Sequence, residues 1–144
     1  MLGESSYSDC TTTVGGAVAY STDAGASWTR VALAGNGRVE IAQAPSSVSL
    51  GATMTWYASN NGANGQIWRS LDGGVSWTLR SALAHLSGQG WYDNTIVVAP
   101  NDANKLLVGG VSLYLSTDGG ANLQRVCGAH VDHHALVAHP GYAS

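Results

Sequence analysis

An eight-residue motif occurs three times in this 144-residue chain and limits its fold more than any other feature. The copies begin at residues 21, 70 and 116, so their starts are 49 and 46 residues apart. Each copy has Ser, Asp and Gly at its first, third and fifth positions, and the first two copies end in Trp. These positions are Ser21, Asp23, Gly25 and Trp28; Ser70, Asp72, Gly74 and Trp77; and Ser116, Asp118 and Gly120. A repeat with this period predicts similar supersecondary units stacked side by side.

The residue types of the motif predict a tight turn between two strands. The Asp carboxylate can accept hydrogen bonds from backbone amides of its own turn, and Gly permits a positive φ. The Ser hydroxyl can bridge to that carboxylate, while Trp covers the turn with a large apolar surface. The third copy has Leu123 in the Trp position, so we expect its turn to pack less well. We interpret the three Asp residues as turn formers and not as catalytic acids or calcium ligands.

A second repeat, an apolar run that ends in proline, stays in register with the first. Its copies span residues 38–45, 93–100 and 133–140. Further alternating and β-branched runs precede each copy of the motif, and no stretch keeps a helical apolar period. Nineteen glycines suit a chain with many tight turns. The sequence therefore predicts an all-β protein.

Together the two repeats resemble the Asp-box, or BNR, repeats of β-propeller proteins such as sialidases, sortilin-type receptors and xyloglucan-degrading glycosidases. The resemblance implies blades of four antiparallel strands, with the apolar run innermost and the Asp-box turn on the periphery. Residues 37–81 and 91–127 are then two complete blades of a single segment, 1–144. Residues 7–32 supply strands two to four of a partial blade, and residues 130–140 supply the inner strand of a further or shared blade.

About three blades fall short of the ~4–8 of a closed propeller. Such an arc leaves open strand edges and an uncovered apolar face at each end, which favours association. Two explanations stay open: the chain is a fragment of a longer protein, or copies of it close into one ring with a blade divided between chain ends. Both lead us to expect self-association.

Polar and aromatic residues gather at the predicted starts of the inner strands, which in a propeller lie at the channel mouth. The residues that we expect to bind a ligand there are Arg38, Glu40, Trp91, Tyr92, Asn94 and His133. The favoured function is a non-catalytic scaffold that binds a glycan or a protein. The resemblance implies an extracellular or periplasmic setting, although the chain starts with no signal peptide.

The alternative function is part of a glycoside hydrolase, with Asp93 and Asp132 as the catalytic acids. Glycosidases place two carboxyl groups about 5–10 Å apart across the scissile bond. These two residues belong to neighbouring inner-strand starts, and Glu40 is a weaker third choice. The arginine triad of sialidases is not present, because only Arg38 lies on an inner strand.

One short run of residues suggests a metal-binding site. In an extended chain His130, Asp132 and His134 lie on one side, and three such N and O ligands could hold a divalent ion. The outer two are ~13 Å apart along a strand, so one ion requires a bend. A hydrogen-bonded polar rim is the simpler interpretation, and no other cofactor is expected.

Charge, hydropathy and cysteine content restrict the partners and covalent links that we expect for this chain. The net charge is −3 and the six basic residues form no stripe, so we expect no nucleic-acid partner. No apolar run approaches the roughly 18 residues of a spanning helix, so we expect no membrane insertion. Cys10 and Cys127 are either buried free thiols or a disulfide that joins the chain ends.

Overall fold

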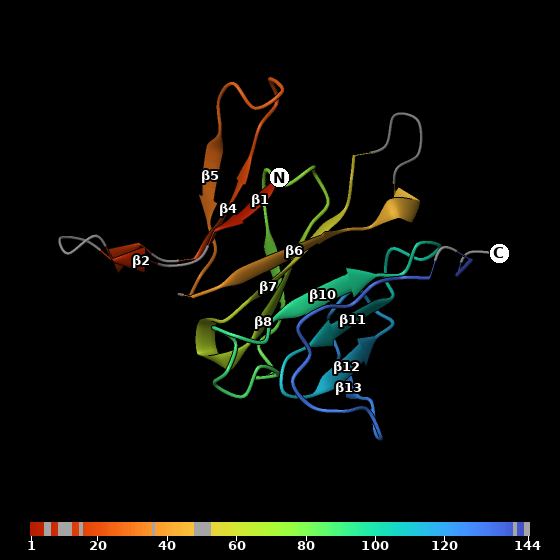
Figure 1. Ribbon diagram of the computed structural model, residues 1–144. Helices are drawn as coiled ribbons and strands as arrows, with labels where there is room; N and C mark the ends of the chain where they lie inside the picture. Colours follow the sequence, from red (N-terminus) through yellow and green to blue (C-terminus); the bar gives the residue numbers. More distant parts are fainter. Residues whose placement is uncertain are drawn as a thin grey trace.

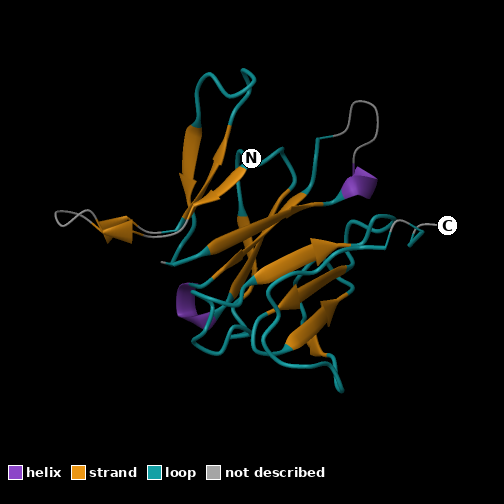
Figure 2. Ribbon diagram, in the orientation of Figure 1, coloured by secondary structure: helices purple, strands orange, loops and turns teal. Residues whose placement is uncertain are grey.

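The computed structural model describes residues 1–4, 7–8, 13–14, 16–35, 37–47, 53–139 and 141–142. Its regular structure is almost entirely antiparallel strand, with two short 3₁₀ turns, η1 (Pro45–Ser47) and η2 (Gly62–Asn64) (Figures 1 and 2). The predicted all-β class is confirmed. No helix in the described part of the chain is long and apolar enough to cross a membrane.

Two four-stranded sheets share one topology, in which each strand pairs with the next along the chain. Sheet 2 consists of β6 (Val39–Gln43), β7 (Trp56–Asn60), β8 (Gln66–Ser70) and β9 (Thr78–Ser81). Sheet 3 consists of β10 (Thr95–Val98), β11 (Leu106–Gly109), β12 (Leu113–Ser116) and β13 (Gln124–Arg125). Both lie within the repeat units predicted at 37–81 and 91–127.

Sheet 1 has three strands: β1 (Leu2–Glu4), β4 (Ala17–Tyr20) and β5 (Thr29–Ala32). The sequence predicted that the partial unit begins at residue 7. The strand that pairs with β4 is β1, which lies before that residue. The reason is an insertion, because β2 (Tyr7–Ser8) and β3 (Thr13–Val14) form a separate hairpin between β1 and β4 (Figure 1).

Apolar side chains fill the spaces between successive sheets. Between sheets 1 and 2 the buried cluster consists of Val18, Leu33, Val39 and Ala58. Between sheets 2 and 3 it consists of Ala44, Tyr57, Ile67, Ile96, Val98, Leu106 and Val108. Burying a side chain of this size contributes about 1.5–3 kcal/mol, so these two layers hold the three sheets together.

The motif of sheet 2 forms the turn between β8 and β9. Ser70 Oγ donates to Asp72 Oδ1 at 2.7 Å and accepts from the Gly74 amide at 2.8 Å. The Ser76 amide donates to Asp72 Oδ1 at 2.9 Å, and the Ser76 hydroxyl donates to Oδ2. The hydrogen bonds from Ser76 are the main cause that lowers the pKa of Asp72 to about 2. The carboxylate is thus the centre of the turn.

The other two copies form the same turn, between β4 and β5 and between β12 and β13. In both, the residue four positions after the Asp donates from backbone and side chain, which lowers the pKa of Asp23 and of Asp118 to about 2. The expectation of looser packing at Leu123 is wrong. Leu123 packs against the cluster between sheets 2 and 3, whereas Trp28 is 46% exposed. What Leu123 lacks is the indole hydrogen bond to the turn carbonyl that both Trp residues make.

Residues 130–139 belong to no strand ladder in the single chain, although the sequence predicts a strand over 130–140. Pro140 lies outside the described residues. A strand needs a neighbour for its ladder, and sheet 3 already has its four strands in order. Cys127 is a free and exposed thiol, so a buried or disulfide-bonded Cys127 is wrong, and Cys10 lies outside the described residues.

Candidate functional site

The predicted site residues lie at the end of the sheets opposite the turns that the repeated eight-residue motif forms. β6 and β10 begin at this end, next to the β7–β8 loop that carries η2 and to the connection of residues 82–94 (Figure 1). The Asn61 amide donates to the Arg38 carbonyl at 3.0 Å, and the Leu86 amide donates to the Asn64 carbonyl at 2.9 Å. These bonds hold the loops against the strand starts.

Asp93 and Asp132 are brought together in the fold. Asp93 is fully buried, and neither of its carboxyl oxygens has a hydrogen-bond partner among the described residues. Burial raises the pKa of Asp93, and the charge and nearby carboxyl of Asp132 raise it further, while His134 lowers it.

The two members of this pair differ in their access to solvent. Asp132 is exposed and has a positive φ of 65°. Its amide donates to the Val111 carbonyl at 3.2 Å, which ties it to the β11–β12 turn. A ligand that approaches from solvent therefore meets Asp132 first, with Asp93 behind it.

Two aromatic side chains stand exposed beside the carboxyl pair. Trp91 is 69% exposed and Tyr92 is 54% exposed, with ring centroids 5.4 Å apart at 40°. Tyr92 also meets the His134 ring edge-on, with centroids 4.5 Å apart at 73°. The Tyr92 and Asp93 amides both donate to the Gln89 carbonyl, which closes a turn before β10. The turn buries Asp93 and leaves both rings in solvent.

Arg38 and Glu40 support this arrangement. Arg38 Nε and Nη2 both lie 2.7 Å from Glu40 Oε1, and Nη1 donates to the Tyr92 carbonyl. The pair is half-buried, so the two charges are partly shielded from water. The structure thus shows Arg38 holding the backbone of the aromatic residue.

Asn94 and His133 make contacts within the fold. Asn94 is fully buried, and its Nδ2 donates to the carbonyls of Ser59 at 3.0 Å and Arg38 at 3.3 Å, across two strands. The His133 amide donates to the Gly110 carbonyl, and His133 Nδ1 lies 3.1 Å from the same oxygen. We interpret both residues as supports of the site and not as ligand contacts.

The predicted metal ligands are not gathered at one point. Within the residues that the structure describes, no group of three or more His, Cys, Asp or Glu side chains could hold an ion. His130 Nδ1 lies 2.7 Å from the neighbouring Val131 carbonyl, and His134 lies on the Tyr92 ring. The metal site stays a prediction without a geometry to support it.

Sequence reasoning missed a buried histidine behind the site. His85 is fully buried, its Nε2 lies 3.1 Å from Ser59 Oγ, and its Nδ1 has no partner among the described residues. Burial lowers the pKa of His85 to about 4, so the ring is neutral at pH 7. A lone histidine in a glycine-rich connection has no pattern from which burial could have been predicted.

The fold and the site define a class: an all-β protein of packed antiparallel sheets with an aromatic and carboxyl site at one end. Comparisons with family models, with curated proteins and with solved structures give no match for this chain. Membership of the Asp-box family stays a prediction that the comparisons do not test.

Proposed function

We propose that this chain is a non-catalytic segment of an Asp-box β-propeller that binds a glycan through Trp91, Tyr92 and Asp132, with Asp93 buried behind Asp132 as the second member of a carboxyl pair. The observation that carries the proposal is the placement of two exposed aromatic rings directly beside this carboxyl pair. Adjacent exposed aromatic side chains form a continuous apolar patch, and such patches are characteristic of interaction sites.

A sugar ring fits this chemistry on both of its sides. Its C–H face is apolar and stacks on an aromatic ring, while its hydroxyl groups donate to carboxylates in a small number of fixed directions. Asp132 is the exposed acceptor, and Arg38 keeps Tyr92 in place through the backbone bond. A protein ligand, the other partner expected from the sequence, would use the rings without needing the carboxyl pair.

Three features support the propeller part of the proposal. Sheets 2 and 3 have the same strand order, all three Asp-box turns share the hydrogen bond from Ser to Asp, and apolar layers separate successive sheets. In this arrangement the site lies at the channel mouth. An extracellular or periplasmic setting, where glycans are accessible, is part of the proposal and is supported by the family resemblance alone.

The complete burial of Asp93 favours binding over hydrolysis. A glycosidase separates its two carboxyl groups by about 5–10 Å, so that the scissile bond, with or without a water, fits between them. Here Asp93 has no exposed surface, so its carboxyl group is not open to a scissile bond in solvent. We therefore interpret the pair as a hydrogen-bonding element of a binding site.

A glycan panel tests the proposal. We expect wild-type protein to bind at least one neutral oligosaccharide, and Trp91→Ala and Asp132→Asn each to weaken that binding by at least tenfold. Trp28→Ala is the matched control, because Trp28 is also exposed but lies at an Asp-box turn. Binding that is unaffected by Trp91→Ala would contradict the proposal. Release of reducing sugar that disappears in Asp93→Asn would favour the hydrolase instead.

A further inference from the structure

Sheet 1 has one strand fewer than sheets 2 and 3, and the repeat identifies which one. In sheets 2 and 3 the second strand meets the start of the next unit's first strand: Ser59 of β7 accepts from Asn94, and Gly109 of β11 lies against His133. Gly3 of β1 meets Val39 of β6 in the same way, since a side chain on Gly3 would clash with the Val39 carbonyl. β1 is therefore a second strand, and sheet 1 has no first strand among the described residues.

The C-terminal segment, residues 133–139, corresponds to a first strand but has no sheet to pair with in the single chain. It aligns with β6 and β10 in the repeat, and it starts where the first strand of another unit would start, beside the β11–β12 turn. The His133 amide is bonded to the Gly110 carbonyl, but the backbone of residues 134–138 forms no hydrogen bond with the described part of the chain. Val137 in this segment is 90% exposed.

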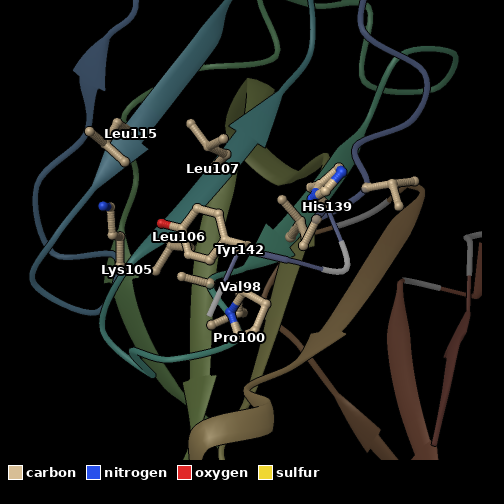
Figure 3. A pocket seen from close by; sticks show the side chains of 12 residues that line it. Val98, Pro100, Lys105, Leu106, Leu107, Leu115, His139 and Tyr142 are labelled. Atoms are coloured by element: carbon tan, nitrogen blue, oxygen red, sulfur yellow. The ribbon is translucent and has the colours of Figure 1, made fainter. Parts of the chain in front are cut away.

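The outer face of sheet 3 is apolar and has no sheet over it in the single chain. Val97, Leu107 and Leu115 are cross-strand neighbours on this face and line a pocket of about 230 Å³. His139 and Tyr142 (Figure 3), together with Val137 and Ala138, also line this pocket, so the C-terminal segment already lies beside this face in the single chain. The residue of sheet 2 that corresponds to Leu107 is Tyr57, and sheet 3 buries it completely. A fourth sheet would cover Leu107 in the same manner.

We propose that two copies of this chain close on each other by exchanging their C-terminal segments. Each segment pairs with β1 of the other copy as the missing first strand, and each sheet 1 covers the Val97–Leu107–Leu115 face of the other copy. A second copy is the matching partner, because one chain carries both a sheet without a first strand and a first strand without a sheet. The product is a closed ring of six four-stranded sheets with two equal interfaces.

The repeat register also fixes where Val137 lies in this dimer. Val137 corresponds to Val97, and Val97 lies on the same face of its sheet as Gly109. In the completed sheet 1, Val137 thus faces the same side as Gly3 and its pair Val18, toward the cluster between sheets 1 and 2. A side chain that is 90% exposed in the single chain becomes part of a core in the dimer.

Small side chains complement the bulky face of sheet 3. Val18 points toward sheet 2, so its neighbours Ala17 and Ala19 point to the opposite face of β4. Ala32 lies beside Ala17 on the adjacent strand. Ala17 is already fully buried in the single chain, whereas Ala19 and Ala32 keep exposed surface, so these two small side chains leave room for Leu107 and Leu115 of the other copy.

Native mass spectrometry and hydrogen exchange test the exchange together. We expect a dimer of about 29.6 kDa, twice the 14.8 kDa of the chain, and slow exchange of the amides of residues 134–138. Val137→Asp places a carboxylate in the shared core, so it should raise the dimer dissociation constant at least 100-fold and make those amides exchange fast. Its circular dichroism should still show strand, because Val137 is exposed in the single chain.

Val75→Asp is the matched control, because Val75 is 53% exposed at the turn between β8 and β9, away from both proposed interfaces. It should stay dimeric. The proposal is overturned by a wild-type monomer, by fast exchange of residues 134–138 in the dimer, or by a dimer that Val137→Asp leaves intact. These readouts use no glycan, so they fail or succeed independently of the binding function.

Discussion

Replacing Asp93 with Asn should stabilise this protein at neutral pH. Asp93 is fully buried, and no described residue donates a hydrogen bond to either carboxyl oxygen. Its burial and the neighbouring Asp132 both oppose its ionisation. Asn is nearly the same size and carries no charge, so the substitution removes a cost without opening a cavity.

The magnitude follows from the missing hydrogen bonds. An unsatisfied buried polar group costs about 1–3 kcal/mol, and a charged group costs more. Asn still buries an amide, so only part of this cost disappears. We expect Asp93→Asn to raise the free energy of unfolding at pH 7 by about 1–3 kcal/mol. The cost would be retained in the natural sequence because the carboxyl group serves the site.

The gain in the free energy of unfolding from Asp93→Asn should increase as the pH rises. The pKa of Asp93 is raised in the folded protein above its ordinary value of 3.8. Below that value both states hold the proton, and the wild type and the variant should be equally stable. As the pH rises above it, the unfolded state loses its proton first, so the wild type becomes less stable relative to the variant.

Urea denaturation at fixed protein concentration, followed by tryptophan fluorescence at pH 3.5 and pH 7, measures this difference. Asp102→Asn is the matched control, because Asp102 is exposed, and we expect a change within about 0.5 kcal/mol. A less stable Asp93→Asn variant at pH 7, or an equal gain at both pH values, would refute the reasoning.

Three further predictions concern the turns, the layer between sheets and the buried histidine. Asp72→Ala should lower the free energy of unfolding by about 1–2 kcal/mol, as the loss of a cap does, and urea titration measures it. Because the pKa of Asp72 is about 2 in the folded state, wild-type stability from this group should be lost as the pH falls from about 4 through 2. Tyr57→Phe removes the 2.8 Å bond to the Ala103 carbonyl and should cost about 1 kcal/mol, whereas exposed Tyr92→Phe should cost little; equal effects would contradict this. His85, with a pKa of about 4, should make stability rise between about pH 4 and 6.5, since the unfolded state binds the proton first; a His85→Asn variant that keeps this rise would refute it.

The sequence was sufficient for the strand class and for the turns. The residues of the repeated motif act locally, within five positions of each other, so their hydrogen bonds could be predicted without a fold. The strand at residues 2–4 could not, because three residues carry no periodic signal and the β2–β3 hairpin separates them from β4. The packing of Leu123 was misjudged for a related reason: the motif does not show which sheet a turn residue touches.

The sequence predicted the location of the candidate site well, but it predicted the roles of the individual residues less well. The repeat placed Asp93 and Asp132 at neighbouring strand starts, and the fold brings them together. Whether a carboxyl group there is buried depends on the 82–94 connection, which no spacing reveals. Arg38 and Asn94 were predicted as ligand contacts, but the Arg38 guanidinium and Asn94 Nδ2 are bonded within the fold, and Asn94 Oδ1 is buried without a partner among the described residues. Residue type alone cannot distinguish a group that binds a ligand from one that holds the site.

The central claim, that the Trp91–Tyr92 site binds a glycan, is tested most directly by the indole N–H signals in an NMR titration. The chain has five tryptophans, and Trp91 is the most exposed large hydrophobic residue of the site. A Trp91→Phe variant assigns its signal. When a glycan that binds is added, we expect the Trp91 signal to move with saturation while those of Trp28 and Trp77, at the turns of the repeated motif, stay in place. Binding that leaves the Trp91 signal unmoved would contradict it.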